Sequence, residues 1–426
     1  MRHRPPHVPA TNSLVVAALA AAVVSAATGC KSKPASTIGP SLPGEPVIRV
    51  RVDAGRDTLT LEGPDAVLIG PPRTAEPDRC RTPLTLVHRN DRWHIDGRPE
   101  LAWRGPLALA DPEGGALPLG DRRYPERLIL VPRPDLPPFD KTRDRFDVVN
   151  HVHLEAYLPG VLDKELYPGW RPTTFYAQAI AARSYAIHHM LHAAADRHYD
   201  VESTQASQVY GGATKNLRAV QAVLETTGLV LTDGERVLQA FYSSTCGGAG
   251  ASPTDAFGGE TAQAPLVPEP RQAWCRDSKH FAWPTIRRSR AALAPRLAAW
   301  GRAHNHAIAR LREIKSIAVD ARNHVGRPSR FVVVGGSGER FTLPAEPFRQ
   351  ACNFRADRLP PPGARLKSAF LDVARLGRQI EFTAGRGFGH GVGLCQFGAQ
   401  AMAEHGHDVL EILNTYYPAA RVERAY

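Results

Sequence analysis

Cysteine and methionine are scarce in this chain, with six and three copies among 426 residues. The cysteines form no CxxC pair and no zinc-finger spacing with histidine, so the sequence predicts neither a metal site nor another cofactor. The lysines form no block and the aromatic residues form no ladder, which argues against nucleic acid as a partner. No internal repeat is evident. These absences indicate a globular protein without the usual signatures of metal or nucleic-acid binding.

The most informative segment that is present is a glycine-rich run, residues 385–399, with the sequence GRGFGHGVGLCQFGA. No Lys-Ser or Lys-Thr follows the glycines, and no second βα unit follows the run, which argues against a nucleotide site. A strand is expected before it at 379–383 and a helix after it at 399–405. Such a strand–loop–helix segment can present polar groups to a ligand, and glycine allows close backbone approach.

The N-terminal segment is typical of an export signal. Charged residues at 2–4 precede an apolar run at 14–27, and Thr28-Gly29-Cys30 follows. The run is too short for a comfortable membrane span. The ending resembles the lipobox of bacterial lipoproteins, so we expect residues 1–30 to be a lipoprotein signal peptide with lipidation at Cys30; a plain secretory signal is the alternative. Lys31 then favours a lipid-anchored protein of the outer membrane that faces the periplasm.

The charge balance suggests an acidic partner. There are 53 basic and 42 acidic residues, a net charge of +11, and cell wall would serve as the polyanion. Five cysteines remain after processing, and their pairing cannot be read from the sequence. A metal site made by Cys246, His390 and Cys395 is conceivable, but buried thiols or disulfides are the favoured interpretation.

The pattern of the chain predicts an α+β fold that begins with an all-β module. A Pro/Ser/Gly-rich tether at 31–46 leads to short alternating strands at 47–138, including a hairpin around Asn90-Asp91. Residues 146–426 are expected to form a two-lobed α+β domain. There, a strand at 146–154 is followed by a short helix that begins at Pro159. An insertion at about 274–354 is expected to form the second lobe.

Five sequence blocks in the second region carry a resemblance. They are LEAYLPGVLDKEL (154–166), AQAIAARSYA (177–186), SQVYGG (207–212), YSSTCGG (242–248) and the glycine-rich run with its continuation to ILNTYYP (412–418). Together and in this order they resemble the stage II sporulation protein D / amidase enhancer family. The resemblance covers roughly residues 146–420 and implies a cell-wall protein, with a lytic transglycosylase that cleaves peptide-free glycan strands as the best understood activity.

The resemblance maps the family's catalytic glutamate onto Glu165, although Tyr167 is an extra residue before Pro168. One carboxylate is enough if the 6-hydroxyl of the muramic acid acts as an internal nucleophile, whereas hydrolytic glycosidases generally need two. Glu165 would then be general acid and base with a pKa raised by burial. The alternative is an exposed helix glutamate in an i, i+4 pair.

Eight further residues in these blocks are predicted to bind substrate: Arg183, Tyr185, Gln208, Tyr210, Ser243, Ser244, His390 and Gln396. A salt bridge to Asp163 or Asp200 is the alternative for Arg183, a place in the core is the alternative for Tyr210, and a helix cap is the alternative for Gln396. Some family members hold zinc close to the third block, but this chain has no cysteine there, so we carry no metal over.

The resemblance leaves two functions open. The first is a lytic transglycosylase of denuded peptidoglycan strands. The second is a non-catalytic glycan-binding enhancer of an N-acetylmuramoyl-L-alanine amidase, which would make a cell-wall amidase a partner. A structural anchor between the outer membrane and the wall is a third possibility, and it rests on the lipobox and the basic charge alone.

Overall fold

The computed structural model describes residues 42–99, 101, 103–133, 144–204, 207–259, 264–268 and 272–426. Residues Leu42–Tyr426 form one compact unit. The predicted signal peptide, Cys30 and most of the predicted tether lie outside the described residues. Among the helices that are described, none combines the length and apolar character needed to cross a membrane.

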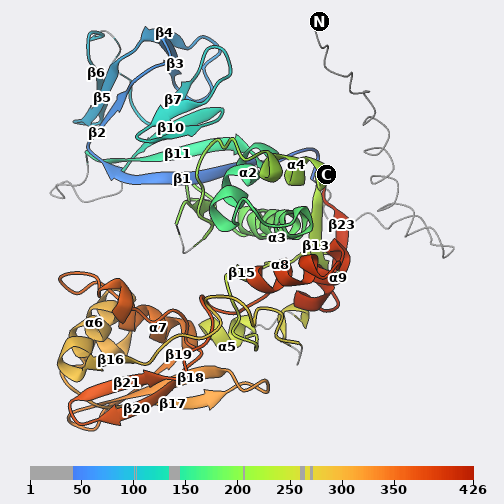
Figure 1. The fold of residues 1–426 in the computed structure, drawn as a ribbon. Helices are drawn as coiled ribbons and strands as arrows, with labels where there is room; N and C mark the ends of the chain where they lie inside the picture. The colour runs from blue at the N-terminus through green and yellow to red at the C-terminus, as the bar shows by residue number, and fades with distance from the viewer. Residues whose placement is uncertain are drawn as a thin grey trace, which may run out of the picture. The chain divides into compact units, whose positions relative to one another are not determined.

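Seven strands form the largest sheet, which Figure 1 shows in blue to green, in the order β12-β1-β11-β10-β7-β3-β4. They are β1 (Val47–Arg56), β3 (Ala66–Gly70), β4 (Asp78–Arg81), β7 (Leu107–Ala110), β10 (Arg127–Pro132), β11 (Phe146–His153) and β12 (Val201–Glu202). The long strands β1 and β11 are antiparallel, with Val47 opposite His153. The short β12 runs parallel to β1.

Two small sheets accompany the large one. They consist of β2 (Thr58–Leu61), β5 (Leu84–Arg89) and β6 (Arg92–Ile95), and of β8 (Leu117–Leu119) and β9 (Arg122–Tyr124). The hairpin predicted around Asn90-Asp91 is confirmed, because β5 and β6 pair across it. Both turn residues have positive φ, as a two-residue hairpin turn requires and as Asn and Asp tolerate.

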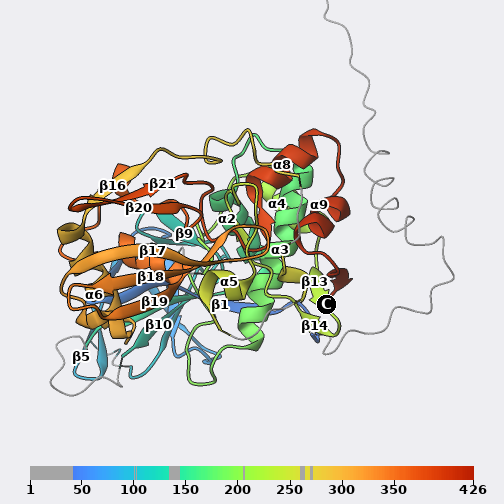
Figure 2. The ribbon, with the colours of Figure 1, turned by 90° about the horizontal axis from the view of Figure 1, so that it is seen from below.

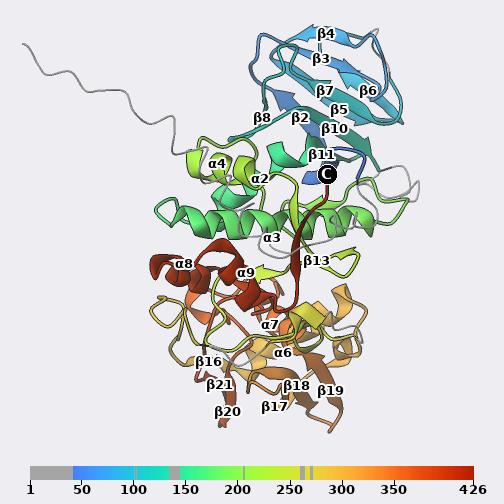
Figure 3. The ribbon, with the colours of Figure 1, turned by 90° about the vertical axis from the view of Figure 1, so that its right-hand side faces the viewer.

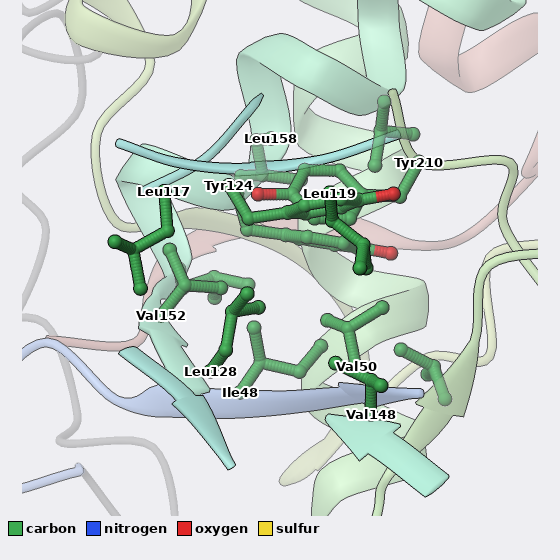
Figure 4. Packing of buried hydrophobic residues seen from close by; sticks show 14 of the residues in the cluster. Ile48, Val50, Leu117, Leu119, Tyr124, Leu128, Val148, Val152, Leu158 and Tyr210 are labelled. Carbon is green, nitrogen blue, oxygen red and sulfur yellow. The ribbon is translucent and has the colours of Figure 1, made fainter. Parts of the chain in front are cut away.

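The region 47–138 is rich in strands, but it does not form a separate module. The predicted boundary falls between β10 and β11, which are antiparallel neighbours. One core contains Ile48 and Val50 of β1 together with Leu158, from the helix that follows β11, and Tyr210, as Figure 4 shows. Since burial is shared across the boundary, the β-rich region and the start of the second region fold on one another.

Three helices pack next to this sheet: α2 (Leu154–Glu165), α3 (Pro172–Leu191) and α4 (Leu217–Glu225). The prediction that the first of them starts at Pro159 is wrong, because α2 starts directly after β11 and contains Pro159 within its length. The central helix α3 also contacts α8 and α9 (Figure 3). Phe175 and Ala179 belong to the first core, while Ala177 and Ala181 belong to another, so α3 is buried on opposite faces.

The second core surrounds the other face of α3 and includes the end of the glycine-rich run. Its elements are β13 (Leu229–Asp233), β14 (Arg236–Val237), β15 (Tyr242–Ser243), α5 (Pro253–Phe257), the 3₁₀ turn η1 (Ala264–Leu266), β22 (Leu394–Cys395), α8 (Gln396–Glu404), α9 (Val409–Tyr416) and β23 (Arg421–Arg424). The terminal strand β23 pairs with β13, which returns the end of the chain to this region.

A third core lies in the lobe that the sequence predicts at about 274–354. Its elements are β16 (Ile286–Ser289), α6 (Arg290–Ala303), the 3₁₀ turn η2 (Ala307–Arg310), β17 (Ile314–Arg322), β18 (Pro328–Gly335), β19 (Arg340–Pro344), α7 (Ala345–Asn353), the 3₁₀ turn η3 (Pro362–Ala364), β20 (Asp372–Leu376) and β21 (Gln379–Thr383). Figure 2 shows the strands of this lobe and α6. The lobe extends beyond the predicted end, because β21 returns to pair with β16. The α+β class is confirmed.

Candidate active site

Glu165 is the last residue of α2, and the local sequence explains why the helix ends there. Leu166 is already extended. Tyr167 precedes Pro168, and a residue before proline is disfavoured in the helical conformation. The side chain of Glu165 is half-buried. The end of the helix therefore holds this carboxylate at the margin of the core.

Two neutral donors hold the Glu165 carboxylate. The Nε2 amide of Gln396 donates to Oε2 over 3.1 Å, across 231 positions of sequence. The backbone amide of Val209 donates as well. Burial raises the pKa of Glu165, while these two donors oppose the rise. The negative end of α2 also disfavours the ionised form. The carboxyl group is therefore harder to ionise than an exposed glutamate.

A close backbone approach brings the third block to Glu165. The amide of Gly211 donates to the carbonyl of Gly160 over 3.1 Å. A Cβ at Gly160 would lie 2.1 Å from the carbonyl oxygen of Gly212, so this position in α2 accepts only glycine. Because the loop at 207–212 lies against α2, the amide of Val209 can reach the end of the helix.

A second close approach brings Gln396 into place. Strand β22, just before it, pairs in parallel with β15. The amide of Phe397 donates to the carbonyl of Ser244 over 3.0 Å. A Cβ at Gly393 would lie 2.0 Å from the carbonyl oxygen of Phe241, which explains one glycine of the run. The fourth block thus fixes the start of α8 and with it the amide that contacts Glu165.

Gln208 lies in a buried polar chain behind the carboxylate. Its Oε1 accepts from the hydroxyl of Tyr157 over 3.1 Å. Its Nε2 donates to the hydroxyl of Tyr242 over 3.0 Å and to the carbonyl of Ala182 over 3.2 Å. Burial first, and Glu165 in part, raise the pKa of both tyrosines. Gln208 is fully buried, and its hydrogen bonds hold the hydroxyl groups of Tyr157 and Tyr242 in place.

Among the predicted substrate-binding residues, Arg183 and Tyr210 are, like Gln208, interior residues, which argues against direct contact with a substrate. The Arg183 side chain is 0% exposed; its guanidinium pairs with Glu155 at 2.7 Å and donates to the carbonyl of Leu229. Sequence reasoning foresaw a salt bridge but named other partners. Tyr210 is 0% exposed and its hydroxyl donates to Asn150, so the core alternative describes it.

Three further predicted residues, Tyr185, Ser243 and His390, make contacts within the protein. Tyr185 is buried next to Tyr242, and burial raises its pKa to about 12. Ser243 accepts from the amide of Gly391 through Oγ at 3.3 Å. His390 lies next to Phe257, and its Nδ1 accepts from a backbone amide two residues later. Burial lowers the pKa of His390 to about 4, so its ring is neutral at neutral pH.

A row of aromatic rings near Glu165 was not predicted as a binding surface. This aromatic strip consists of Tyr167, Trp170, Phe397, His280 and Phe388. Phe397 is central, with ring centroids 5.0 Å from Trp170 and 5.9 Å from Tyr167. His280 continues the row, 5.7 Å from Phe397 and 5.0 Å from Phe388.

Two members of the aromatic strip are open to solvent, since Tyr167 is 46% and Phe388 40% exposed. Large exposed rings in a row suit a flat ligand such as a sugar. Tyr167 and Trp170 follow Glu165 within five residues, so the segment Tyr-Pro-Gly-Trp was the sequence signal available. The sequence analysis treated Tyr167 only as an extra residue before Pro168.

Comparison with known proteins agrees with these blocks. The model of the SpoIID family, described as stage II sporulation protein, matches residues 142–232, which contain the first three blocks. An uncharacterized protein of Brachyspira hyodysenteriae is 30% identical over 275 residues, which cover 64% of this chain and 67% of that protein. The chain belongs to the stage II sporulation protein D family.

Two named relatives come from Bacillus subtilis. Stage II sporulation protein D is 26% identical over 301 residues, covering 65% of this chain and 76% of the relative. A protein named amidase enhancer is 24% identical over 288 residues, covering 61% of this chain but only 39% of the relative. The family is a cell-wall family, and the names include both a sporulation protein and an enhancer of an enzyme.

Proposed function

We propose that the protein is a lytic transglycosylase that cleaves peptide-free peptidoglycan strands, with Glu165 as general acid and then general base. The observation that carries the proposal is the half-buried Glu165, whose pKa burial raises and whose carboxylate is held by Gln396 and Val209. A general acid needs a pKa above that of an ordinary carboxyl group, and burial at a helix C-terminus shifts the pKa of Glu165 in this direction.

The reaction needs one carboxyl group in two protonation states. Glu165 protonates the glycosidic oxygen as the bond from the muramic acid C1 breaks, and the departing sugar leaves with a free hydroxyl. The 6-hydroxyl of the same muramic acid then bonds to C1, and the Glu165 carboxylate takes up its proton. A 1,6-anhydro ring forms, and the carboxyl group regains its starting state.

The surroundings of Glu165 favour this route over hydrolysis. Burial, Gln396 and Val209 set its pKa, and no carboxylate of the described residues is among those influences. Asp163 is two positions away on α2, where helical side chains do not face each other. Its Oδ1 accepts from the side-chain Nδ2 of Asn216 over 3.1 Å. Hydrolytic glycosidases instead place two carboxyl groups on either side of the bond.

The aromatic strip supplies a binding surface for the glycan in this proposal. Two of its rings lie close in sequence to the two residues of the Glu165–Gln396 hydrogen bond. Tyr167 is two positions after Glu165, and Phe397 directly follows Gln396. Lys279 adds a cation over the Tyr167 ring, with Nζ 5.1 Å from the centroid. A cation here suits the lactyl carboxylate that denuded strands carry after their peptides are removed.

The proposal includes the cellular setting. The chain is exported and held by lipid at Cys30, so that the domain acts on the wall from the periplasmic face of the outer membrane. A cell-wall amidase supplies its substrate by removing the stem peptides. The second candidate is a glycan-binding enhancer of such an amidase, favoured by the relative named amidase enhancer.

The test is incubation of the whole chain with peptide-free glycan strands, followed by mass spectrometry of the product ends. The transglycosylase proposal predicts 1,6-anhydro ends that disappear in Glu165→Gln and persist in Glu225→Gln. Glu225 is a suitable control because it is also the last residue of a helix, α4, but is exposed. Strand binding without any cleavage by the wild type would decide for the enhancer.

A further inference from the structure

Three cysteines from distant parts of the sequence meet in the interior. Cys246 follows β15, Cys275 lies in the loop that leads to β16, the first strand of the lobe, and Cys395 ends β22. All three are buried, and their sulfur atoms lie within 4.8 Å of one another. The Sγ atoms of Cys246 and Cys275 are 3.6 Å apart. The sequence analysis considered Cys246 and Cys395 together with His390, whereas in the structure the third member of the cluster is Cys275.

The spacing of the sulfur atoms fits a shared metal ion. Zinc–thiolate bonds of about 2.3 Å in a tetrahedral site place sulfur atoms about 3.8 Å apart. A disulfide needs sulfur atoms about 2.05 Å apart and can use only two of the three. Three converging thiols are thus better matched to one soft cation than to a pairwise bond.

The neighbouring Cys246 thiol raises the pKa of Cys275 to about 11 and burial raises that of Cys395, so both sulfur atoms keep their protons until a cation replaces them; backbone groups partly oppose this. The amide of Cys246 donates to Sγ of Cys395 over 3.2 Å. The amide of Gly247 donates to the sulfur of Cys275. Gly247 and Gly248 both have positive φ, so the chain turns tightly directly after Cys246. Cys395 is also the N-cap of the nine-residue helix α8, whose positive end stabilises a negative sulfur.

A buried cation, Arg327, lies against the cysteine cluster. Arg327 is 1% exposed, and its guanidinium donates to four backbone carbonyls, one of them that of Cys246 at 2.7 Å. No carboxylate of the described residues forms an ion pair with it. Cys246, Glu346, Cys395 and Asp255 all act on it electrostatically, with Cys246 the largest of the four. Three thiolates around a divalent ion carry one net negative charge, which this guanidinium balances.

From this geometry we propose that Cys246, Cys275 and Cys395 bind one Zn²⁺ ion as thiolates. Three thiols release three protons when the ion binds, and no electron is transferred. The ion joins the fourth block, the loop before the lobe and the start of α8. Because Gln396 directly follows Cys395, the site would also keep Gln396 in contact with Glu165. Only this last consequence rests on the proposed function.

The experiment measures metal rather than glycan cleavage. The whole chain, reduced and then loaded with Zn²⁺, is expected to retain one ion per chain after gel filtration. Co²⁺ in its place should give thiolate-to-metal charge-transfer absorption in the near ultraviolet. Both signals should be lost in Cys275→Ser and kept in Cys352→Ser, a control that removes a buried cysteine of α7. Glu165→Gln should bind metal like the wild type, so the two proposals fail separately.

A measurement on the unaltered chain guards against a variant that fails to fold. A thiol-modifying mercurial should release the bound zinc in proportion to the cysteines that react. Retention of less than a tenth of an ion per chain would overturn the proposal, as would a Co²⁺ spectrum unchanged by Cys275→Ser. So would a Cys246–Cys275 disulfide found by peptide mapping of chain exported and purified without reductant.

Discussion

Glu155 and Glu165 occupy the two ends of the same helix, α2, and their surroundings differ in kind. Glu155 in the first turn pairs with Arg183 at 2.7 Å and accepts from the amide of Gly228 at 3.0 Å. Glu165 in the last turn has two neutral donors, and no described cation forms an ion pair with it. The helix dipole favours an ionised carboxylate at the first position and disfavours it at the second.

The difference separates a structural carboxylate from one that can exchange a proton. A buried arginine pairs with Glu155 and ties it to the core, and removing either partner would leave the other charge buried and unpaired. Amide donors fix the orientation of Glu165 without neutralising it, so its carboxyl group can cycle between states. The predictions below test this contrast.

The largest expected effect is on catalysis. Glu165→Gln removes the proton donor but keeps the size of the side chain, so cleavage of peptide-free strands should slow by about 10²–10⁴-fold. The melting temperature should stay close to that of the wild type, because no ion pair is broken. Initial rates and thermal unfolding measured on the same preparation check this. A variant that cleaves at the wild-type rate would remove Glu165 from the mechanism.

At the other end of the helix the effect should be on stability. Glu155→Gln leaves the buried guanidinium of Arg183 without its partner and should lower the free energy of unfolding by about 3–5 kcal/mol. Denaturant titration measures the loss. Adding Arg183→Met should recover part of it, since the unpaired charge is then gone. If the single variant is as stable as the wild type, the pair does not have the structural role assigned to it.

The pH dependence of stability has a definite sign at Glu165. Its pKa in the folded chain is raised above the ordinary value, so the folded state holds its proton to higher pH than the unfolded state. The resulting stabilisation is present below the unfolded pKa and is lost as the pH rises through the folded pKa. Relative to Glu165→Gln, the wild type should therefore lose stability as the pH rises through that window. Parallel stability curves for the two chains would contradict the raised pKa.

Gln396→Ala tests the donor itself. Gln396 lowers the pKa of Glu165, so its removal should raise that pKa further. The alkaline limb of the kcat/KM profile should then move to higher pH, with a rate loss on the order of tenfold from poorer orientation. An unchanged profile would mean that the contact at 3.1 Å has no influence on the acid. Gln400→Ala is a suitable control, because Gln400 is on the same helix but contacts Thr174.

The smallest expected effect concerns the aromatic strip. Tyr167→Ala should raise KM about fivefold, equivalent to about 1 kcal/mol of ring contact, while kcat changes little. Steady-state kinetics with strands of defined length separate the two parameters. Leu224→Ala, which removes an exposed apolar side chain of α4, should leave both unchanged. A fall in kcat alone would indicate that Tyr167 acts on Glu165 rather than on the glycan.

The sequence predicted structural features that depend on neighbouring residues better than features that depend on distant ones. The hairpin at Asn90-Asp91 was predictable because its turn residues tolerate positive φ. The start of α2 was missed because proline was taken to mark a first turn, whereas α2 accepts Pro159 in its interior. The shared core of the β-rich region could not be read from the sequence, since β1 pairs with a strand about a hundred residues away.

The candidate site shows the same division. Glu165 could be named from its block, but its contact with Gln396 spans 231 positions and appears only in three dimensions. Arg183 was recognised as a residue that needs a partner, and the partner Glu155 was not identifiable from spacing alone. Cys275 belongs to none of the five blocks, so nothing in the sequence paired it with Cys246 and Cys395.

Digestion of peptide-free strands in water enriched in ¹⁸O tests the single-carboxylate mechanism most directly. If the 6-hydroxyl of the muramic acid is the nucleophile, wild-type products should carry 1,6-anhydro ends without ¹⁸O, and Glu165→Gln should give none. Products with reducing ends that contain ¹⁸O would show that water attacks C1. That result would contradict the account, because a second carboxyl group would then have to activate the water.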